Sequence, residues 1–227
     1  MVVQADSSDD ETDWLMELAA STDHIAGVVG WVDLTSPSVG DRLAELRDRG
    51  GVICGIRHQV FEEPDKGWLS RADVSAGLAA VSAAGLAYDL LIRRPESAAA
   101  IVAVEEHPEL VFVVDHAAVP GPADEWDDWL VDLTALAAHG NVYCKISGLE
   151  GAGTAGRSLA AYVAAVIDAF GPERCMFGSD WPMSQVHSRY GTVLERVQGA
   201  TDRLSDAERN SVFHATATTV YRLDRQL

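Results

Sequence analysis

The chain has 227 residues and a formal net charge of −18 at pH 7. Acidic surfaces repel phosphate backbones and anionic lipids, so this charge argues against nucleic acid and membrane surfaces as partners. No apolar run approaches the ~18 residues of a membrane-spanning helix, and the acidic N-terminus lacks a signal-peptide pattern, so we expect a cytoplasmic protein.

Seven short apolar runs predict buried strands, and stretches with helical spacing alternate with them. The predicted strands are Val2–Gln4, Ile25–Val32, Val52–Ile56, Leu86–Ile92, Val111–Val114, Val142–Ile146 and Cys175–Phe177. The predicted helices are Asp9–Thr22, Val39–Arg47, Arg71–Ala84, Pro95–Glu106, Trp126–Ala138, Ser158–Phe170, Ser188–Val197 and Ser205–Val220. This alternation predicts a parallel α/β fold, either a barrel or an open sheet. No linker divides the chain, so we expect residues 1–227 to form a single domain.

The motifs that are missing exclude several chemistries. The chain has no G-x-S-x-G elbow, no P-loop and no H-E-x-x-H pair, which argues against a nucleophilic serine, a nucleotide site and a zinc protease. Cys54, Cys144 and Cys175 fall in predicted strands without C-x-x-C spacing, so we expect buried free thiols. The remaining chemistry is attack by water, assisted by a carboxylate while histidine and cations polarise the substrate.

Asp180 follows the last predicted strand, within Gly178-Ser179-Asp180-Trp181-Pro182. The glycine lets the backbone bend and the proline keeps Trp181 out of the helical region, which predicts a fixed turn. A carboxylate at the carboxyl end of a barrel strand can act as a general base toward water. We therefore interpret Asp180 as catalytic; the alternative is an aspartate that only accepts hydrogen bonds from turn amides.

Asp115 and His116 end the predicted strand Val111–Val114. Because adjacent residues of an extended strand point to opposite faces, we expect only one of the two to face a pocket. His116 would bind a metal there or donate a hydrogen bond to a carbonyl group. The alternative is a core histidine with its hydrogen bonds satisfied.

Cationic side chains stand at two further strands. Arg57 and His58 follow Val52–Ile56, where Arg57 would bind a carboxylate or ring oxygen of a substrate, or else pair with Glu62 or Glu63. Lys145 lies inside an apolar strand, so it needs a partner such as Asp115 or Asp180. Three weaker candidates for the pocket wall are Gln4, Trp31 and Arg93.

Several motifs resemble the amidohydrolase-related (amidohydrolase 2) family. They are Gly55-Ile56-Arg57-His58-Gln59, Trp68-Leu69, Tyr88-Asp89-Leu90-Leu91, Asp115-His116, Tyr143-Cys144-Lys145-Ile146-Ser147-Gly148 and Phe177-Gly178-Ser179-Asp180-Trp181-Pro182. The resemblance runs from Val2 to Tyr221. Within the family, the chain looks most like sugar lactonases of the L-fuconolactonase and L-rhamnono-lactonase type.

This resemblance implies a distorted (β/α)8 barrel that hydrolyses the ester bond of a sugar lactone or a related small cyclic ester, in carbohydrate metabolism. It implies that Asp180 activates water and that His116, Arg57 and His58 surround the substrate carbonyl. Metal use varies in the family, so the resemblance implies either no required cofactor or one divalent metal such as zinc. His116 and Asp180 are the only candidate ligands for that metal.

Two features depart from the family pattern. The family begins with a strand that carries a His-x-His pair, and this chain has no such pair. We therefore expect the first β/α unit to be absent and about seven of the eight barrel strands to be present. Val119 also stands where the family commonly has lysine. An open barrel exposes two strand edges. Three explanations account for the missing strand: a reading frame that starts upstream, which is favoured because the other site residues are present, a homo-oligomer that covers the exposed edges, or a non-catalytic relative.

Two alternatives to a lactonase follow from these considerations. One is a zinc-dependent decarboxylase or C–C hydrolase of the same broad family. The other is a truncated or degenerate barrel that binds a sugar acid without turnover.

Overall fold

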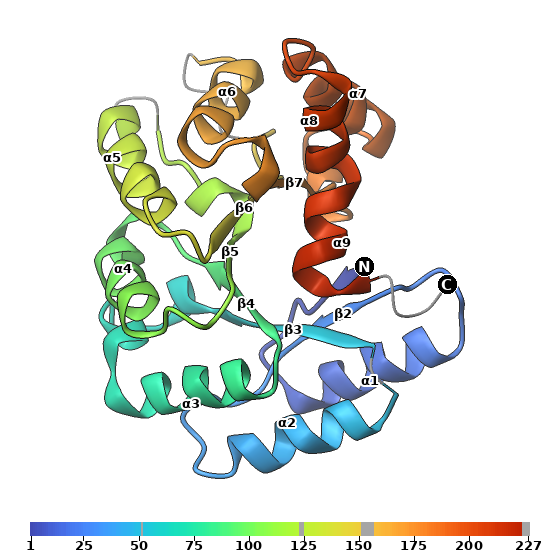
Figure 1. Cartoon of the computed structure of the whole chain (residues 1–227), viewed down its shortest axis with the longest axis vertical. Helices are drawn as coiled ribbons and strands as arrows, with labels where there is room; N and C mark the ends of the chain where they lie inside the picture. Colours follow the sequence, from blue (N-terminus) through green and yellow to red (C-terminus); the bar gives the residue numbers. More distant parts are fainter. Residues whose placement is uncertain (51, 123–124, 151–156, 224–227) are drawn as a thin grey trace.

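The computed structural model describes residues 1–50, 52–122, 125–150 and 157–223. Within these ranges, parallel strands form one seven-stranded sheet in the order β1-β2-β3-β4-β5-β6-β7. The strands are β1 (Val2–Val3), β2 (Val28–Gly30), β3 (Ile53–Gln59), β4 (Ala87–Leu91), β5 (Phe112–Val114), β6 (Val142–Ile146) and β7 (Cys175–Phe177). Figure 1 shows that the sheet curls into a half-barrel. The predicted barrel with seven strands is therefore confirmed.

Helices connect the strands, and most of them cover the outer side of the curled sheet, whereas α9 packs against its other face (Figure 1). They are α1 (Asp9–Ala20), α2 (Val39–Asp48), α3 (Ala72–Ala83), α4 (Ser97–Glu106), α5 (Trp126–Ala137), α6 (Leu159–Phe170), α7 (Tyr190–Ala200), α8 (Asp206–Asn210) and α9 (Thr216–Tyr221). Serine side chains cap three of them: Ser8, Ser158 and Ser205 each accept a hydrogen bond from a backbone N–H of the first turn. None of the helices in the described ranges is long and apolar enough to cross a membrane.

Apolar side chains fill the space between the sheet and its helices, with Tyr88 and Phe112 fully buried and in edge-to-face contact. A smaller cluster lies on the other face of the sheet, where Val29, Cys54 and Met176 pack with Tyr221 of α9. The three cysteines are free and buried, as the sequence predicts. Because every strand runs in the same direction, the carboxyl ends of all strands gather along one rim of the half-barrel.

The structure differs from the predicted elements in several places. The strand predicted over Val52–Ile56 continues to Gln59 as β3, so Arg57 and His58 lie inside the strand and not after it. The strand predicted over Ile25–Val32 is limited to Val28–Gly30. It ends at Gly30 because the backbone N–H and C=O of Trp31 bond to the hydroxyl of Thr12 on α1 instead of a neighbouring strand. The helix predicted over Ser205–Val220 is divided into α8, a π-helical turn over Ser211–Ala215, and α9.

Candidate active site

The chain leaves β5 in a left-handed turn that presents two polar side chains. His116, Ala117, Ala118 and Val119 have φ values of 52°, 51°, 58° and 45°. Strand alternation therefore stops at Val114, and both Asp115 and His116 line the same cavity. The expectation that only one of them faces the pocket is wrong, because the rule of opposite faces holds only for an extended backbone.

A buried row of alternating charges lies beneath the cavity. The Arg57 Nη1 atom is 2.7 Å from Asp115 Oδ2, and Lys145 Nζ is 2.6 Å from Asp115 Oδ1. The same Lys145 Nζ lies 2.5 Å from Asp89 Oδ2, and the Tyr221 hydroxyl donates a 2.8 Å hydrogen bond to Asp89 Oδ1. Lys145 thus has Asp115 as a partner, as expected, but its second partner is Asp89 rather than Asp180.

The buried row shifts the pKa values of its two aspartates in opposite directions. Burial alone would raise the pKa of Asp115, but Lys145, His116 and Arg57 together hold that pKa well below its usual range. Burial raises the pKa of Asp89 even though Lys145 opposes the shift. Burial alone would lower the pKa of Lys145, but the two carboxylates raise it above its usual value. Asp115 and Lys145 are therefore charged at neutral pH.

Asp180 stands at the end of β7 and faces His116. Its φ of 51° places it in the left-handed region, where aspartate and asparagine are the most tolerated residues after glycine. The Asp180 Oδ1 atom is 3.7 Å from His116 Nε2. Burial raises the pKa of Asp180, and Asp115 adds to this shift while His116 and Arg57 oppose it. A carboxylate with a raised pKa is a better proton acceptor than one in water.

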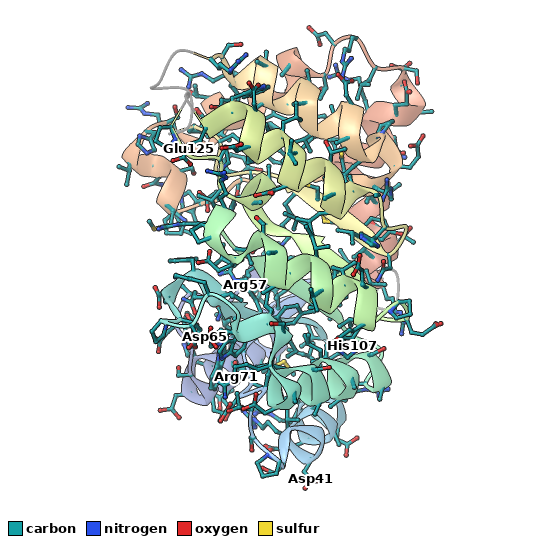
Figure 2. The ribbon with its side chains drawn as sticks, turned by 90° about the vertical axis from the view of Figure 1, so that its left-hand side faces the viewer. Asp41, Arg57, Asp65, Arg71, His107 and Glu125 are labelled. Atoms are coloured by element: carbon teal, nitrogen blue, oxygen red, sulfur yellow. The ribbon has the colours of Figure 1, made fainter. Side chains whose placement is uncertain are left out.

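A cavity of about 790 Å³ brings most of the predicted site residues together. Its lining includes Gln4, Arg57, His116, Lys145 and Asp180. Figure 2 labels Arg57, a residue of β3, near the centre of the molecule. The amide oxygen of Gln4 accepts a 3.1 Å hydrogen bond from Arg57 Nη2, so Gln4 holds the guanidinium in place.

Three predicted substrate-binding residues are not among the side chains that line this cavity. His58 is on the opposite face of β3, where its Nδ1 atom accepts a 2.8 Å hydrogen bond from Trp31 Nε1 and its Nε2 atom lies 2.7 Å from Glu63. The imidazole also stacks on Trp68, with ring centroids 4.3 Å apart. Arg93 lies over the ring of Phe61 at 4.3 Å. The roles of Trp31, His58 and Arg93 in substrate binding therefore stay predictions, and the structure gives these side chains partners outside the lining of this cavity.

Sequence reasoning missed three polar residues of the site: Asp89, Ser147 and Tyr221. Asp89 carries the signal that identified Lys145, a charge inside an otherwise apolar strand. Ser147 lies 2.8 Å from His116 Nδ1 through its hydroxyl. No local pattern marks Tyr221, because its contact with Asp89 joins residues 132 positions apart.

Comparison with known proteins identifies the family of the chain. The family model described as Amidohydrolase matches residues 2–223. The chain belongs to the amidohydrolase family. An L-fucono-1,5-lactonase of Burkholderia multivorans is 37% identical, over 98% of this chain and 80% of that protein. An L-fucono-1,5-lactonase of Burkholderia ambifaria is 35% identical, over 99% of this chain and 80% of that protein.

Solved amidohydrolase structures share the fold. A crystal structure of an amidohydrolase from Burkholderia multivorans with bound zinc superposes with a TM-score of 0.91 at 35% sequence identity. The match covers 97% of this chain and 82% of that one. As a member of the amidohydrolase family, the chain is a hydrolase. In such barrels the active site lies at the carboxyl ends of the strands, where the cavity residues of this chain stand.

The zinc in this relative raises the question of a metal site in the chain itself. Within the described ranges, no group of three or more His, Cys, Asp or Glu side chains is arranged to hold a metal ion. Catalytic zinc sites usually have three protein ligands, whereas His116 and Asp180 provide two. Asp115 is already held by Arg57 and Lys145. The described residues therefore do not fit a complete zinc site.

Proposed function

We propose that the chain hydrolyses the ester bond of a small cyclic ester, and that its substrate is a sugar (aldono) lactone used in carbohydrate metabolism. The observation that carries this proposal is the pair of Asp180 and His116, 3.7 Å apart at the rim of a cavity that also holds Arg57. The similarity to two proteins named L-fucono-1,5-lactonase supports the choice of substrate class.

In the proposed reaction, Asp180 takes a proton from water as the water oxygen attacks the lactone carbonyl carbon. His116 donates a hydrogen bond from Nε2 to the carbonyl oxygen, which becomes negatively charged in the tetrahedral intermediate. The ring C–O bond then breaks, and the leaving ring oxygen receives the proton that Asp180 holds. The product is the open hydroxy acid, and Asp180 is again a carboxylate. Arg57 adds positive charge near the developing anion.

The direct test is turnover of a panel of aldonolactones, followed with a pH indicator because each hydrolysis releases one proton at neutral pH. We expect saturable turnover of at least one lactone above the rate of spontaneous opening. Lactone binding without turnover would instead support the alternative of a protein that binds a sugar acid. Absence of both binding and turnover across the panel would contradict the proposed substrate class.

We further propose that this hydrolysis does not require a metal, because Asp180 supplies the activation of water. We expect turnover to be unchanged after dialysis against a chelator, with bound zinc measured by elemental analysis of the same sample. Stoichiometric zinc together with loss of activity on chelation would contradict this proposal. Stoichiometric zinc without turnover of any lactone would instead favour the zinc-dependent decarboxylase or C–C hydrolase alternative, which substituted benzoates and β-diketones would then test.

A further inference from the structure

The imidazole of His116 is restrained from both of its nitrogen atoms. Its Nδ1 atom lies 2.8 Å from the Ser147 hydroxyl oxygen, and its Nε2 atom lies 3.7 Å from Asp180 Oδ1. Both neighbours come from strand ends, Ser147 after β6 and Asp180 after β7. The position of the ring proton decides whether His116 presents a donor or an acceptor to the cavity.

The surroundings of Ser147 favour one direction for its hydrogen bond. Ser147 is only 5% exposed, and the hydrogen-bond partner that the described residues give its hydroxyl is His116 Nδ1. A buried hydroxyl hydrogen needs an acceptor, which Nδ1 provides when it carries no proton. On the other side of the ring, the Asp180 carboxylate favours a proton on Nε2 because opposite charges attract.

We propose that Ser147 is a positioning residue that donates its hydroxyl hydrogen to His116 Nδ1 and so keeps the proton of the neutral imidazole on Nε2, facing the cavity. Only the catalytic consequence of this inference, a hydrogen bond from His116 to a lactone, rests on the proposed function. An N–H at Nε2 can donate to the carbonyl oxygen of a lactone, while Asp180 remains free to act as the base. The location of the proton itself does not depend on the substrate.

Two glycines allow the ring and the serine to approach this closely. A Cβ atom on Gly148 would lie 2.8 Å from both Cγ and Nδ1 of His116, which is too close for any side chain. A Cβ atom on Gly178 would lie 2.9 Å from the Cβ atom of Ser147. A side chain at position 148 would therefore collide with His116, and one at position 178 would collide with Ser147. Glycine at both positions is what allows the contact between Ser147 and His116.

The decisive measurement is ¹⁵N NMR of the His116 ring in metal-free protein, at a pH where the same spectra show the imidazole to be neutral. We expect the resonance of a protonated Nε2 and of an unprotonated, hydrogen-bonded Nδ1. In Ser147→Ala, the Nδ1 resonance should move downfield toward the value of an unbonded imine nitrogen. A proton on Nδ1 in the wild type, or an Nδ1 resonance unchanged in Ser147→Ala, would overturn the inference.

A matched control is available in Ser184, another buried serine, whose hydroxyl has no hydrogen-bond partner among the described residues. Ser184→Ala should leave both His116 resonances where they are in the wild type. If lactone turnover is found, Ser147→Ala should lower kcat by about fivefold to tenfold, the effect of one neutral hydrogen bond, with little change in KM. Ser147→Cys, which keeps the shape and a weak donor, should recover part of the loss.

The NMR and kinetic outcomes separate this inference from the proposed function. The expected resonances without turnover of any lactone would leave Ser147 as the residue that orients His116 and would reject the lactonase. Turnover with a proton on Nδ1 would reject the role of Ser147 and leave the lactonase intact. A kcat of Ser147→Ala equal to that of the wild type would also reject the role of Ser147.

Discussion

Replacement of Lys145 by methionine is expected to lower the free energy of unfolding by about 3–5 kcal/mol, because it leaves buried charge without its partner. Lys145 Nζ contacts Asp89 Oδ2 at 2.5 Å and Asp115 Oδ1 at 2.6 Å, and both aspartate side chains are completely buried. Methionine fills a similar volume, so little of the loss would come from a cavity. The measurement is equilibrium unfolding in urea at neutral pH.

The loss in Lys145→Met should depend on pH in a defined direction. Burial already raises the pKa of Asp89 in the wild type, and removal of Lys145, which opposes that shift, raises it further. A carboxyl group with a raised folded-state pKa contributes stability below its unfolded pKa and loses that contribution as the pH rises. The difference in unfolding free energy between wild type and variant should therefore be larger at neutral pH than in mild acid.

Two further variants distinguish this explanation from a general loss of packing. In Lys145→Met, Asp115 keeps Arg57 as a partner, whereas Asp89 loses the one ion-pair partner that it has among the described residues. Lys145→Met combined with Asp89→Asn removes this unpaired carboxylate, so the double variant should be more stable than Lys145→Met alone. Arg203→Met breaks the exposed ion pair with Asp168, which should cost no more than about 1 kcal/mol. If Lys145→Met were no more costly than Arg203→Met, the buried row would not stabilise the fold.

The order of strands and helices could be predicted because hydrophobic period is a local property of the sequence. The strand-end positions of Asp115, His116 and Asp180 follow from the same reasoning, since Asp115-His116 comes directly after an apolar run and Asp180 comes three residues after another. Strand length was less predictable. The residues from Ile25 onward are as apolar as a strand, but a hydroxyl on another element, that of Thr12, binds the backbone at Trp31.

Which side chains enter the cavity could not be read from β3 alone. Arg57 and His58 are adjacent, so they lie on opposite faces, but both faces of this strand are covered and neither side is marked as the pocket. The structure resolves this through distant partners. Arg57 meets Asp115, 58 positions away, and His58 meets Trp31 on the other face. The buried contact of Tyr221 with Asp89 has no local signature for the same reason.

Replacement of Asp180 by asparagine is expected to lower kcat by about 10²–10⁴-fold on any lactone that the wild type hydrolyses, the usual contribution of a general base. Asparagine keeps the shape of aspartate but cannot take a proton from water. It also tolerates the left-handed backbone at this position, where φ is 51°. KM should change only a few-fold, since Arg57 and His116 remain in place. Steady-state kinetics on the best substrate measure both constants.

The pH profile and the stability of Asp180→Asn provide independent checks. In the wild type, kcat/KM should fall as the pH drops through the raised pKa of Asp180, and the residual activity of the variant should lack this acid limb. Because the folded-state pKa is raised, ionised Asp180 costs stability at neutral pH, so the variant should unfold at an equal or higher urea concentration. A loss of activity without loss of stability is what a catalytic carboxylate produces.

Asp33→Asn is the matched control for Asp180→Asn. Asp33 is exposed just beyond β2, at the same rim of the half-barrel, but it does not line the cavity. The Asp33→Asn variant removes the same charge from the same end of the sheet as Asp180→Asn does. Because Asp33 does not line the cavity, the kcat of this variant should remain near that of the wild type. Equal losses in the two variants would attribute the effect to the electrostatic potential of the rim. An active Asp180→Asn with an unchanged acid limb would show that another group activates the water.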